Sequence, residues 1–196
     1  MNLEQRIEKI FTDSAQLKLA IAPKLAAPIA RAALITSESL KSGGKILVCG
    51  NGGSAADAQH FSAELLGRYE RERPELAAIA LTTDTSAITA IANDYGFDQI
   101  FAKQVRGLGR SGDVLIAIST SGNSKNVVNA IEAAHLKGMH VIGMTGRDGG
   151  KIAGLMKTGD VLLNVDSQIT TRIQEVHLLT LHCLCDAIDN LMFGEK

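Results

Sequence analysis

The sequence predicts an α/β fold built on a doubly wound, five-stranded parallel sheet flanked by helices. Short apolar runs alternate with longer amphipathic segments along most of the chain. Within each run successive residues are apolar, which is typical of strands buried on both faces, and the amphipathic segments suit crossover helices between parallel strands. The runs are bounded by Gly, Asp or Thr and cover 45–49, 77–81, 113–119, 140–145 and 161–165.

Helices are predicted at both ends of the chain. Apolar side chains recur at helical spacing from the N-terminus onward, and we expect this first helix to break at Pro23. A second helix is expected over 28–41, where Gly43-Gly44 stops it. The segment 171–193 holds no Pro or Gly and predicts one long terminal helix.

The length and composition fit one domain with a helical arm. A chain of 196 residues divides naturally into an arm of 1–42 and a core with a terminal helix over 43–196. Hydrophobic residues make up 45% of the chain and charged residues only 21%, so neither a disordered chain nor a coiled rod fits. A parallel sheet covered on both faces buries part of these hydrophobic residues. We expect the arm and the terminal helix to bury the rest in a subunit interface.

The charge balance and the termini exclude other functions. With 20 basic and 21 acidic side chains, the chain has no surplus of positive charge to neutralise a nucleic-acid backbone. No direct nucleic-acid partner is therefore expected. The N-terminus is charged from Glu4, and charges and prolines interrupt the most apolar stretch, 17–35, so neither a signal peptide nor a membrane span is expected. Three cysteines without a CxxC spacing fit a reducing, cytoplasmic location.

Ligands of a doubly wound sheet bind beyond the carboxyl ends of its strands, where the strand order reverses. The loop after the first run begins at Gly50, holds three glycines and opens a helix, which suits close approach to an anion. Its Gly50-x-Gly52-x-x-Ala55 spacing also matches a loose dinucleotide fingerprint. That fingerprint needs an acid about twenty positions on, whereas Asp84 comes about thirty positions on. A nucleotide cofactor is therefore not expected, and a glycine turn that eases packing is the plainer alternative.

The loop after the third run, Ser-Thr-Ser-Gly-Asn-Ser at 119–124, is rich in hydroxyls and opens a helix over 125–137. A helix N-cap needs one hydroxyl, so three remain for a phosphate cradle. Neither loop carries the Gly-Lys-Ser/Thr ending of a nucleoside triphosphate loop, so a single phosphate on a polar body, such as a sugar phosphate, fits better. Asn93 and Asp94 could read sugar hydroxyls, although such pairs are often structural in turns.

Two helices carry groups suited to acid–base or metal chemistry. His60 and Glu64 are four residues apart and share a helix face. In the terminal helix Gln174, His177 and His182 lie within about two turns, and their angular positions do not decide which His shares a face with Gln174. Such side chains can ligate zinc or act as an acid–base pair across a substrate. A single His or Glu on a helix more often has neither role.

The segment 68–74 alternates basic and acidic side chains, which predicts a solvated connection. Arg68 directly follows the helix that carries Glu64 and is the candidate in this segment for reaching a ligand. We assign no function to the other charges of the segment.

Three segments resemble the motifs of bacterial phosphoheptose isomerases, which belong to the sugar-isomerase (SIS) domain superfamily. These segments are Gly50–Phe61, Ser119–Ser124 and Arg172–Glu175. The resemblance covers essentially the whole chain, with the motifs in the family's order and spacing. It implies a flavodoxin-like SIS-domain sheet and N-terminal helices that join a homotetramer. It also implies interconversion of sedoheptulose 7-phosphate and D-glycero-D-manno-heptose 7-phosphate by enediol chemistry, the first step of heptose supply for the lipopolysaccharide core.

The resemblance also implies roles for individual positions. Glu64 and His182 match the family's acid–base pair, which selects His182 over His177, and the hydroxyls of 119–124 match its phosphate site. One zinc ion per subunit is implied, with the ligands His60, Glu64, Gln174 and His182. The implied substrate-binding residues are Asn51, Gly52, Gly53, Ser54, Glu64, Arg68, Asn93, Asp94, Ser119, Thr120, Ser121, Ser124 and Gln174.

A regulatory branch of the same family, which binds the bacterial replication initiator protein, gives the alternative hypothesis. The C-terminal segment 183–190 resembles that branch as well. The branch does not keep a carboxylate and an imidazole at the positions of Glu64 and His182, whereas this sequence keeps both. The sequence therefore favours the enzyme, with a non-catalytic regulator as the alternative.

Overall fold

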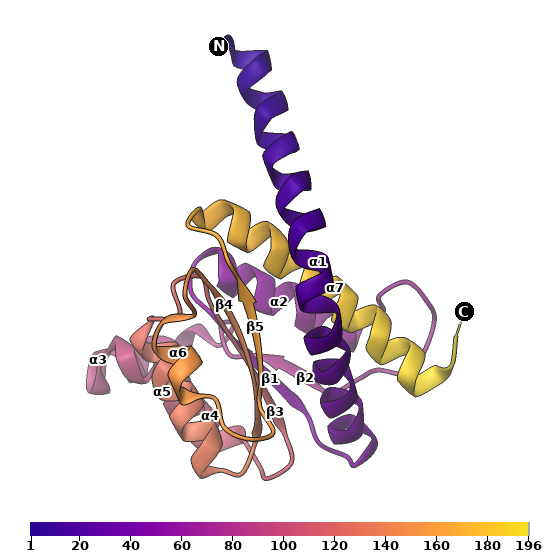
Figure 1. Cartoon of the computed structure of the whole chain (residues 1–196). Coiled ribbons are helices and arrows are strands. Elements are labelled where there is room, and N and C mark those ends of the chain that lie inside the picture. Colours follow the sequence, from indigo (N-terminus) through magenta and orange to yellow (C-terminus); the bar gives the residue numbers. More distant parts are fainter. Residues whose placement is uncertain (196) are drawn as a thin grey trace.

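The computed structural model describes residues 1–195 and contains a five-stranded sheet with helices on both faces (Figure 1). The strand order is β2-β1-β3-β4-β5, and every neighbouring pair is parallel. The predicted doubly wound, flavodoxin-like sheet is confirmed. The strands are β1 (Ile46–Cys49), β2 (Ala78–Ala80), β3 (Val114–Ser119), β4 (His140–Gly146) and β5 (Val161–Val165).

The helices are α1 (Leu3–Lys41), α2 (Gly53–Leu66), α3 (Thr85–Tyr95), α4 (Ile100–Leu108), α5 (Lys125–Leu136), α6 (Gly150–Leu155) and α7 (Thr170–Phe193), with a short 3-10 helix at Phe97–Gln99. One core packs the sheet against α1, α2 and α7, and the other packs it against α4, α5 and α6. Ile46 and Val48 of β1 belong to the first core, and Leu47 and Cys49 belong to the second. Successive strand residues therefore face two apolar cores, which explains why the runs are continuously hydrophobic.

The predicted break at Pro23 is wrong, because α1 runs unbroken through Pro23 and Pro28 and includes the helix expected over 28–41. A proline inside a helix costs about 3 kcal/mol, since it removes one backbone hydrogen bond and crowds the preceding turn. The carbonyl groups left unpaired belong to Leu19 and Lys24, which are both exposed, so water can reach them. Ile21 and Leu25 are buried in the core that α7 shares. Packing of α1 against this core thus outweighs the local cost.

The N-terminal half of α1 extends beyond the rest of the molecule (Figure 1). It carries the exposed apolar side chains Leu3, Ile7, Ile10 and Phe11. Both α1 and α7 contain an 18-residue window long and apolar enough to cross a membrane, and 44% of the α7 window is buried in the fold. Core helices of soluble proteins pass the same test, so the two windows are weak evidence for a membrane span.

Candidate functional site

The loops after β1 and β3 meet at the carboxyl edge of the sheet, where the strand order reverses. Asn51 donates a hydrogen bond to Asn126 Oδ1 at 2.9 Å, and Asn126 donates one to Asn51 Oδ1 at 2.7 Å. The sequence pattern does not single out the buried Asn126. Its one local signal is its place in the first turn of the helix after the hydroxyl-rich loop, two residues beyond Ser124.

Close packing explains two of the glycines in the loop after β1. A Cβ at Gly50 would lie 2.7 Å from the carbonyl oxygen of Ser54, and a Cβ at Gly53 would lie 2.6 Å from Gln174 Nε2 on α7. Gly52 has a φ of +57°, which favours glycine, and it is exposed. The loop therefore serves packing and also presents open backbone beside which a ligand can lie.

The hydroxyl-rich loop after β3 folds around Ser119. Ser119 Oγ lies 2.9 Å from Ser124 Oγ and 3.4 Å from the Ser124 amide nitrogen. Thr120, Ser121 and Ser124 are half-buried. Within the described chain, no side-chain hydrogen bond caps the first turn of α5, which begins directly after Ser124. Unpaired N–H groups at a helix N-terminus, with hydroxyls beside them, suit a phosphate group.

The turn after β4 supports the shape of the hydroxyl-rich loop. Gly122 has a φ of +65°, and a Cβ there would overlap the carbonyl oxygen of Gly149. The Ile152 amide donates to the Gly122 carbonyl at 3.0 Å, and the Lys151 amide donates to Asn123 Oδ1 at 3.1 Å. The sequence pattern does not indicate this support, because the partners come from a different loop of the chain.

The second part of the site lies between α2 and α7. The Nε2 atoms of His60 and His182 lie 2.8 Å apart, with the two rings edge to face. Glu64 Oε1 lies 3.5 Å from His60 Nε2. A hydrogen bond between two ring nitrogens requires a proton on one of them. Two imidazoles and a carboxylate therefore converge at a place that water reaches, because the His60 and Glu64 side chains are 40% and 21% exposed.

Gln174 lies apart from this group. It packs beside Gly53, at the start of α2, whereas His182 meets His60 two turns later. The two helices therefore run parallel, and Gln174 and His182 are about 12 Å apart along the axis of α7. Within residues 1–195, no three His, Cys, Asp or Glu side chains are arranged as a metal centre as they stand. Ligand atoms on a tetrahedral zinc ion are about 3.3 Å apart, so the two imidazole nitrogens would have to separate slightly to share one ion.

The structure separates the two histidines of α7 that spacing could not distinguish. His177 is buried, and its Nε2 lies 2.9 Å from the carbonyl oxygen of Thr145 in β4. Burial lowers the pKa of His177 to about 4, so its ring is neutral at physiological pH. His177 therefore faces the sheet, and His182 is the α7 histidine that faces α2.

Comparison with known proteins adds to this geometry. Residues 11–146 match the model of the SIS domain family. Over 194 residues, the chain is 63% identical to a phosphoheptose isomerase from Azoarcus sp. (strain BH72), a match that covers 99% of this chain and 98% of that protein. The chain belongs to the phosphoheptose isomerase family of SIS-domain proteins.

Solved structures of two phosphoheptose isomerases have nearly the same fold. The Neisseria gonorrhoeae structure has a TM-score of 0.92 and 57% identity, and the match covers 96% of this chain and 100% of that one. The Francisella tularensis structure has a TM-score of 0.94 and 48% identity, with 97% and 100% covered. The agreement extends over the helical arm, the sheet and the terminal helix.

Four of the substrate-binding residues implied by the phosphoheptose isomerase resemblance make none of the contacts described so far. Asn93 and Asp94 are exposed in the last turn of α3 rather than in a turn between elements, and Asn93 donates to Asp94 Oδ1 at 2.7 Å. Arg68 is exposed and pairs with Glu72 at 3.1 Å. Ser54 is buried in the first turn of α2. Within residues 1–195, no hydrogen bond or ion pair joins these four side chains to His60, Glu64 or His182.

Asp57 is a polar residue of α2 that the sequence pattern does not single out. Burial raises the pKa of the Asp57 carboxyl, and the nearby His60 acts in the opposite direction. Asp57 Oδ2 is buried and has no hydrogen-bond partner in the described part of the chain. The one signal in the sequence is its spacing of three residues from His60, which places both on one helix face. Asp57 thus adds a carboxyl group to the polar side chains of α2 near His60.

Replacing Gly122 with Ala should distort the hydroxyl-rich loop, because the new Cβ overlaps the Gly149 carbonyl and the positive φ is strained for Ala. We expect the free energy of unfolding to fall by about 2 kcal/mol and the affinity for inorganic phosphate to fall about tenfold. Thermal unfolding and calorimetric titration measure the two effects.

Gly154→Ala is the matched control for this substitution, because nothing lies within 4 Å of a Cβ at that position of α6. It should keep the wild-type affinity for phosphate. Equal phosphate affinity in the two variants would contradict a phosphate-binding role for the hydroxyl-rich loop.

Proposed function

We propose that this chain is a phosphoheptose isomerase that interconverts sedoheptulose 7-phosphate and D-glycero-D-manno-heptose 7-phosphate, the first step of heptose supply for the lipopolysaccharide core. The observation that carries the proposal is the convergence of Glu64, His60 and His182 between α2 and α7. An aldose–ketose isomerase needs one group to move a carbon-bound proton and another to serve the two oxygens. Membership of the phosphoheptose isomerase family supports the same substrate.

The proposed substrate lies across the carboxyl edge of the sheet. Its phosphate binds the hydroxyls of 119–124 at the N-terminus of α5, and its sugar chain passes Asn51 and the glycine loop toward α2. Arg68, Asn93 and Asp94 are at the surface of a single chain, and in this proposal they reach the substrate where neighbouring copies complete the site. The further residues proposed to line the sugar are Gly52, Gly53, Ser54 and Gln174.

In the proposed reaction Glu64 takes a proton from C1 of the ketose while the C2 carbonyl oxygen gains one, which gives an enediol. Glu64 then returns a proton to C2, and the C1 hydroxyl loses its proton to become the aldose carbonyl. His182 moves protons between the two oxygens, and His60 holds the His182 ring by the 2.8 Å contact. Binding of the remote phosphate orients C1 and C2 against these groups.

Glu64→Gln should lower kcat by about 10²- to 10⁴-fold, because the amide cannot accept the carbon-bound proton. The fold and the affinity for sedoheptulose 7-phosphate should change little, since the side chain keeps its size. The measurement is formation of the aldose product by the wild type and by the variant, with calorimetric binding of the ketose.

Glu132→Gln is the control for this substitution, because Glu132 is exposed on α5, away from the proposed site. A Glu64→Gln variant with wild-type turnover would exclude Glu64 as the base. A folded wild-type protein that binds the ketose and forms no aldose would instead favour the non-catalytic, initiator-binding alternative.

We also propose that the site holds zinc, with His60, Glu64 and His182 as ligands and Gln174 turning from Gly53 to complete the set. The chemistry of the donors supports this, since imidazole nitrogen and carboxylate oxygen are common zinc ligands. The exposed edge of the His60–His182 contact gives an ion a way in. When bound, zinc would polarise the substrate carbonyl as a Lewis acid.

Chelation tests the metal proposal. Purified protein should contain about one zinc ion per subunit, and treatment with a chelator should remove both the ion and most of the activity, with recovery after zinc is added back. His60→Gln should lower the zinc content, measured by elemental analysis. Full activity of a protein shown to be metal-free would contradict this proposal.

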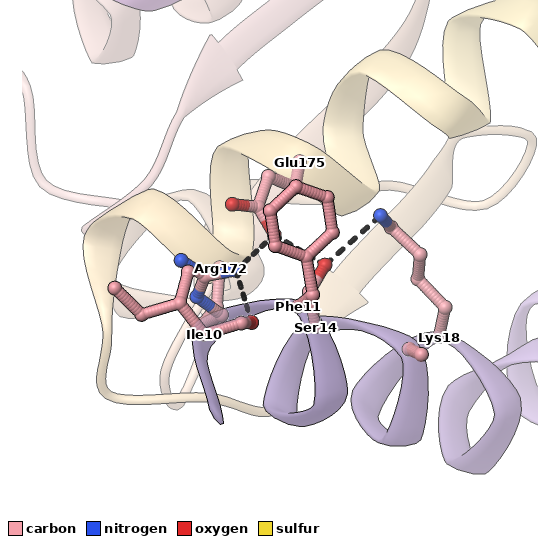
Figure 2. Close-up of a pocket in the computed structure, with 7 residues that line it drawn as sticks. Ile10, Phe11, Ser14, Lys18, Arg172 and Glu175 are labelled. Carbon is pink, nitrogen blue, oxygen red and sulfur yellow. Dashed lines mark hydrogen bonds and ion pairs between the residues drawn. The ribbon is translucent and has the colours of Figure 1, made fainter. Parts of the chain in front are cut away.

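We also propose a homotetramer assembled through α1. Figure 2 shows how the base of the protruding half of α1 is fixed to the start of α7. Arg172 donates to the Ile10 carbonyl at 3.3 Å and to Glu175 at 2.6 Å, while Ser14 donates to Glu175 and accepts from Lys18 at 3.0 Å. The exposed apolar stripe of Leu3, Ile7, Ile10 and Phe11 is therefore presented on a fixed helix, ready to pack against other copies.

Phe11→Glu should dissociate the assembly, because it places a charge within this apolar stripe, at a residue that is 73% exposed in a single chain. Light scattering at micromolar concentration should give a tetramer for the wild type and smaller species for the variant. Leu136→Glu is the control, since Leu136 is 84% exposed at the end of α5 and lies outside the stripe. A monomeric wild type, or a tetrameric Phe11→Glu variant, would contradict the proposed interface.

We further propose that the enzyme works in the cytoplasm without a membrane or nucleic-acid partner. The net charge of −1 and the three free cysteines support this location. The apolar windows of α1 and α7 are assigned in this proposal to the core and to contacts between subunits.

A further inference from the structure

The loop after α2 turns back so that Arg73 closes the end of that helix. Arg73 Nη2 donates to the carbonyl oxygen of Glu64 at 2.7 Å, and Nη1 donates to the carbonyl oxygens of Leu65 and Gly67 at 2.7 and 3.1 Å. The last carbonyls of a helix have no N–H partner within it. The alternating charges of 68–74 predict a solvated connection, and this is wrong at Arg73, whose side chain is 1% exposed because these carbonyls hold it inside.

The same guanidinium also binds α7. Arg73 Nε lies 3.0 Å from Asp189 Oδ1, and the Asp189 side chain is only 5% exposed. The other oxygen, Asp189 Oδ2, is buried without a hydrogen-bond partner in residues 1–195, so Arg73 is the cation that this carboxylate depends on. One side chain thus joins the last turn of α2, which carries Glu64, to α7, which carries His182.

We propose that Arg73 is a positioning residue for the isomerisation. It fixes the last turn of α2 against α7 and thereby holds the Glu64 carboxylate beside the His60–His182 pair. The planar guanidinium supplies several donors in fixed directions, which a lysine ammonium group cannot reproduce at the same carbonyls. The inference rests on the proposed function of Glu64 and His182, and it adds a residue that does not itself touch the substrate.

Arg71 provides a matched comparison in the same loop. Its guanidinium donates to the carbonyl oxygens of Gly194 and Phe193 at 2.6 and 3.2 Å, and it lies 6.0 Å from the centre of the Phe193 ring. Arg71 therefore anchors the loop to the end of α7, and within residues 1–195 its guanidinium makes no hydrogen bond to α2. A substitution there disturbs the loop while leaving the end of α2 bonded to Arg73.

The test compares Arg73→Lys with Arg71→Lys as full-length protein, at a temperature where circular dichroism shows both fully folded. Arg73→Lys should lower kcat for sedoheptulose 7-phosphate about tenfold or more and leave KM within about twofold, because the phosphate loop is built from other elements. Arg71→Lys should keep kcat within about twofold. Imidazole nitrogen NMR resonances of His60 and His182 should shift in Arg73→Lys and remain in place in Arg71→Lys.

A folded Arg73→Lys variant with wild-type kcat, or with unchanged imidazole resonances, would overturn the proposal. If that variant does not fold, Asp189→Asn keeps the shape of the carboxylate and removes its charge, and the same kinetic and NMR comparison decides. If the wild type does not isomerise the ketose, the proposed function fails. The imidazole resonances then still show whether Arg73 positions the pair.

Discussion

The parallel packing of α2 against α7 is the constraint on which the rest of the site depends. The two helices are in contact at three places along their length. Gly53 lies against Gln174, and His60 contacts His182 further along. At the end of α2, Arg73 joins that helix to Asp189 of α7. A slip of one residue would move one helix by about 1.5 Å and turn it by about 100° relative to the other. Such a change would separate the two imidazoles, so the chemistry depends on this register.

The sheet provides the opposite end of the site. At the point where the strand order reverses, the paired amides of Asn51 and Asn126 hold the loop after β1 against the start of α5. Helix α2 begins in that same glycine loop and carries His60 and Glu64 further along one face. It therefore connects the proposed phosphate end to the proposed reacting end, and the spacing between them follows from the rise of a single helix.

Patterns in the sequence predict structural features that depend on neighbouring residues or on a regular spacing of apolar residues. The apolar runs predict the strands because each strand residue faces one of two apolar cores, and the four-residue spacing predicts the shared face of His60 and Glu64. The unbroken α1 is not predictable in this way, since packing against the core, rather than proline chemistry, decides the outcome at Pro23.

Other site features depend on partners far along the chain. Asn126 pairs with a residue 75 positions away, and Arg73 pairs with one 116 positions away, so neither side chain differs in its own segment from an ordinary polar residue. Gly122 needs its conformation because a different loop leaves no room for a side chain. The family resemblance supplies roles for His182 and Gln174, but only the fold shows that Gln174 packs beside the glycine loop.

Solvent exchange during turnover tests whether a carboxylate held between α2 and α7 moves a carbon-bound proton. Sedoheptulose 7-phosphate would be converted by the wild-type protein in D₂O, and the aldose product examined by mass spectrometry and proton NMR. Because the Glu64 side chain is 21% exposed, its proton exchanges with solvent, and we expect product with deuterium at C2. Turnover that places no solvent deuterium at C2, as in a direct hydride shift, would contradict this mechanism.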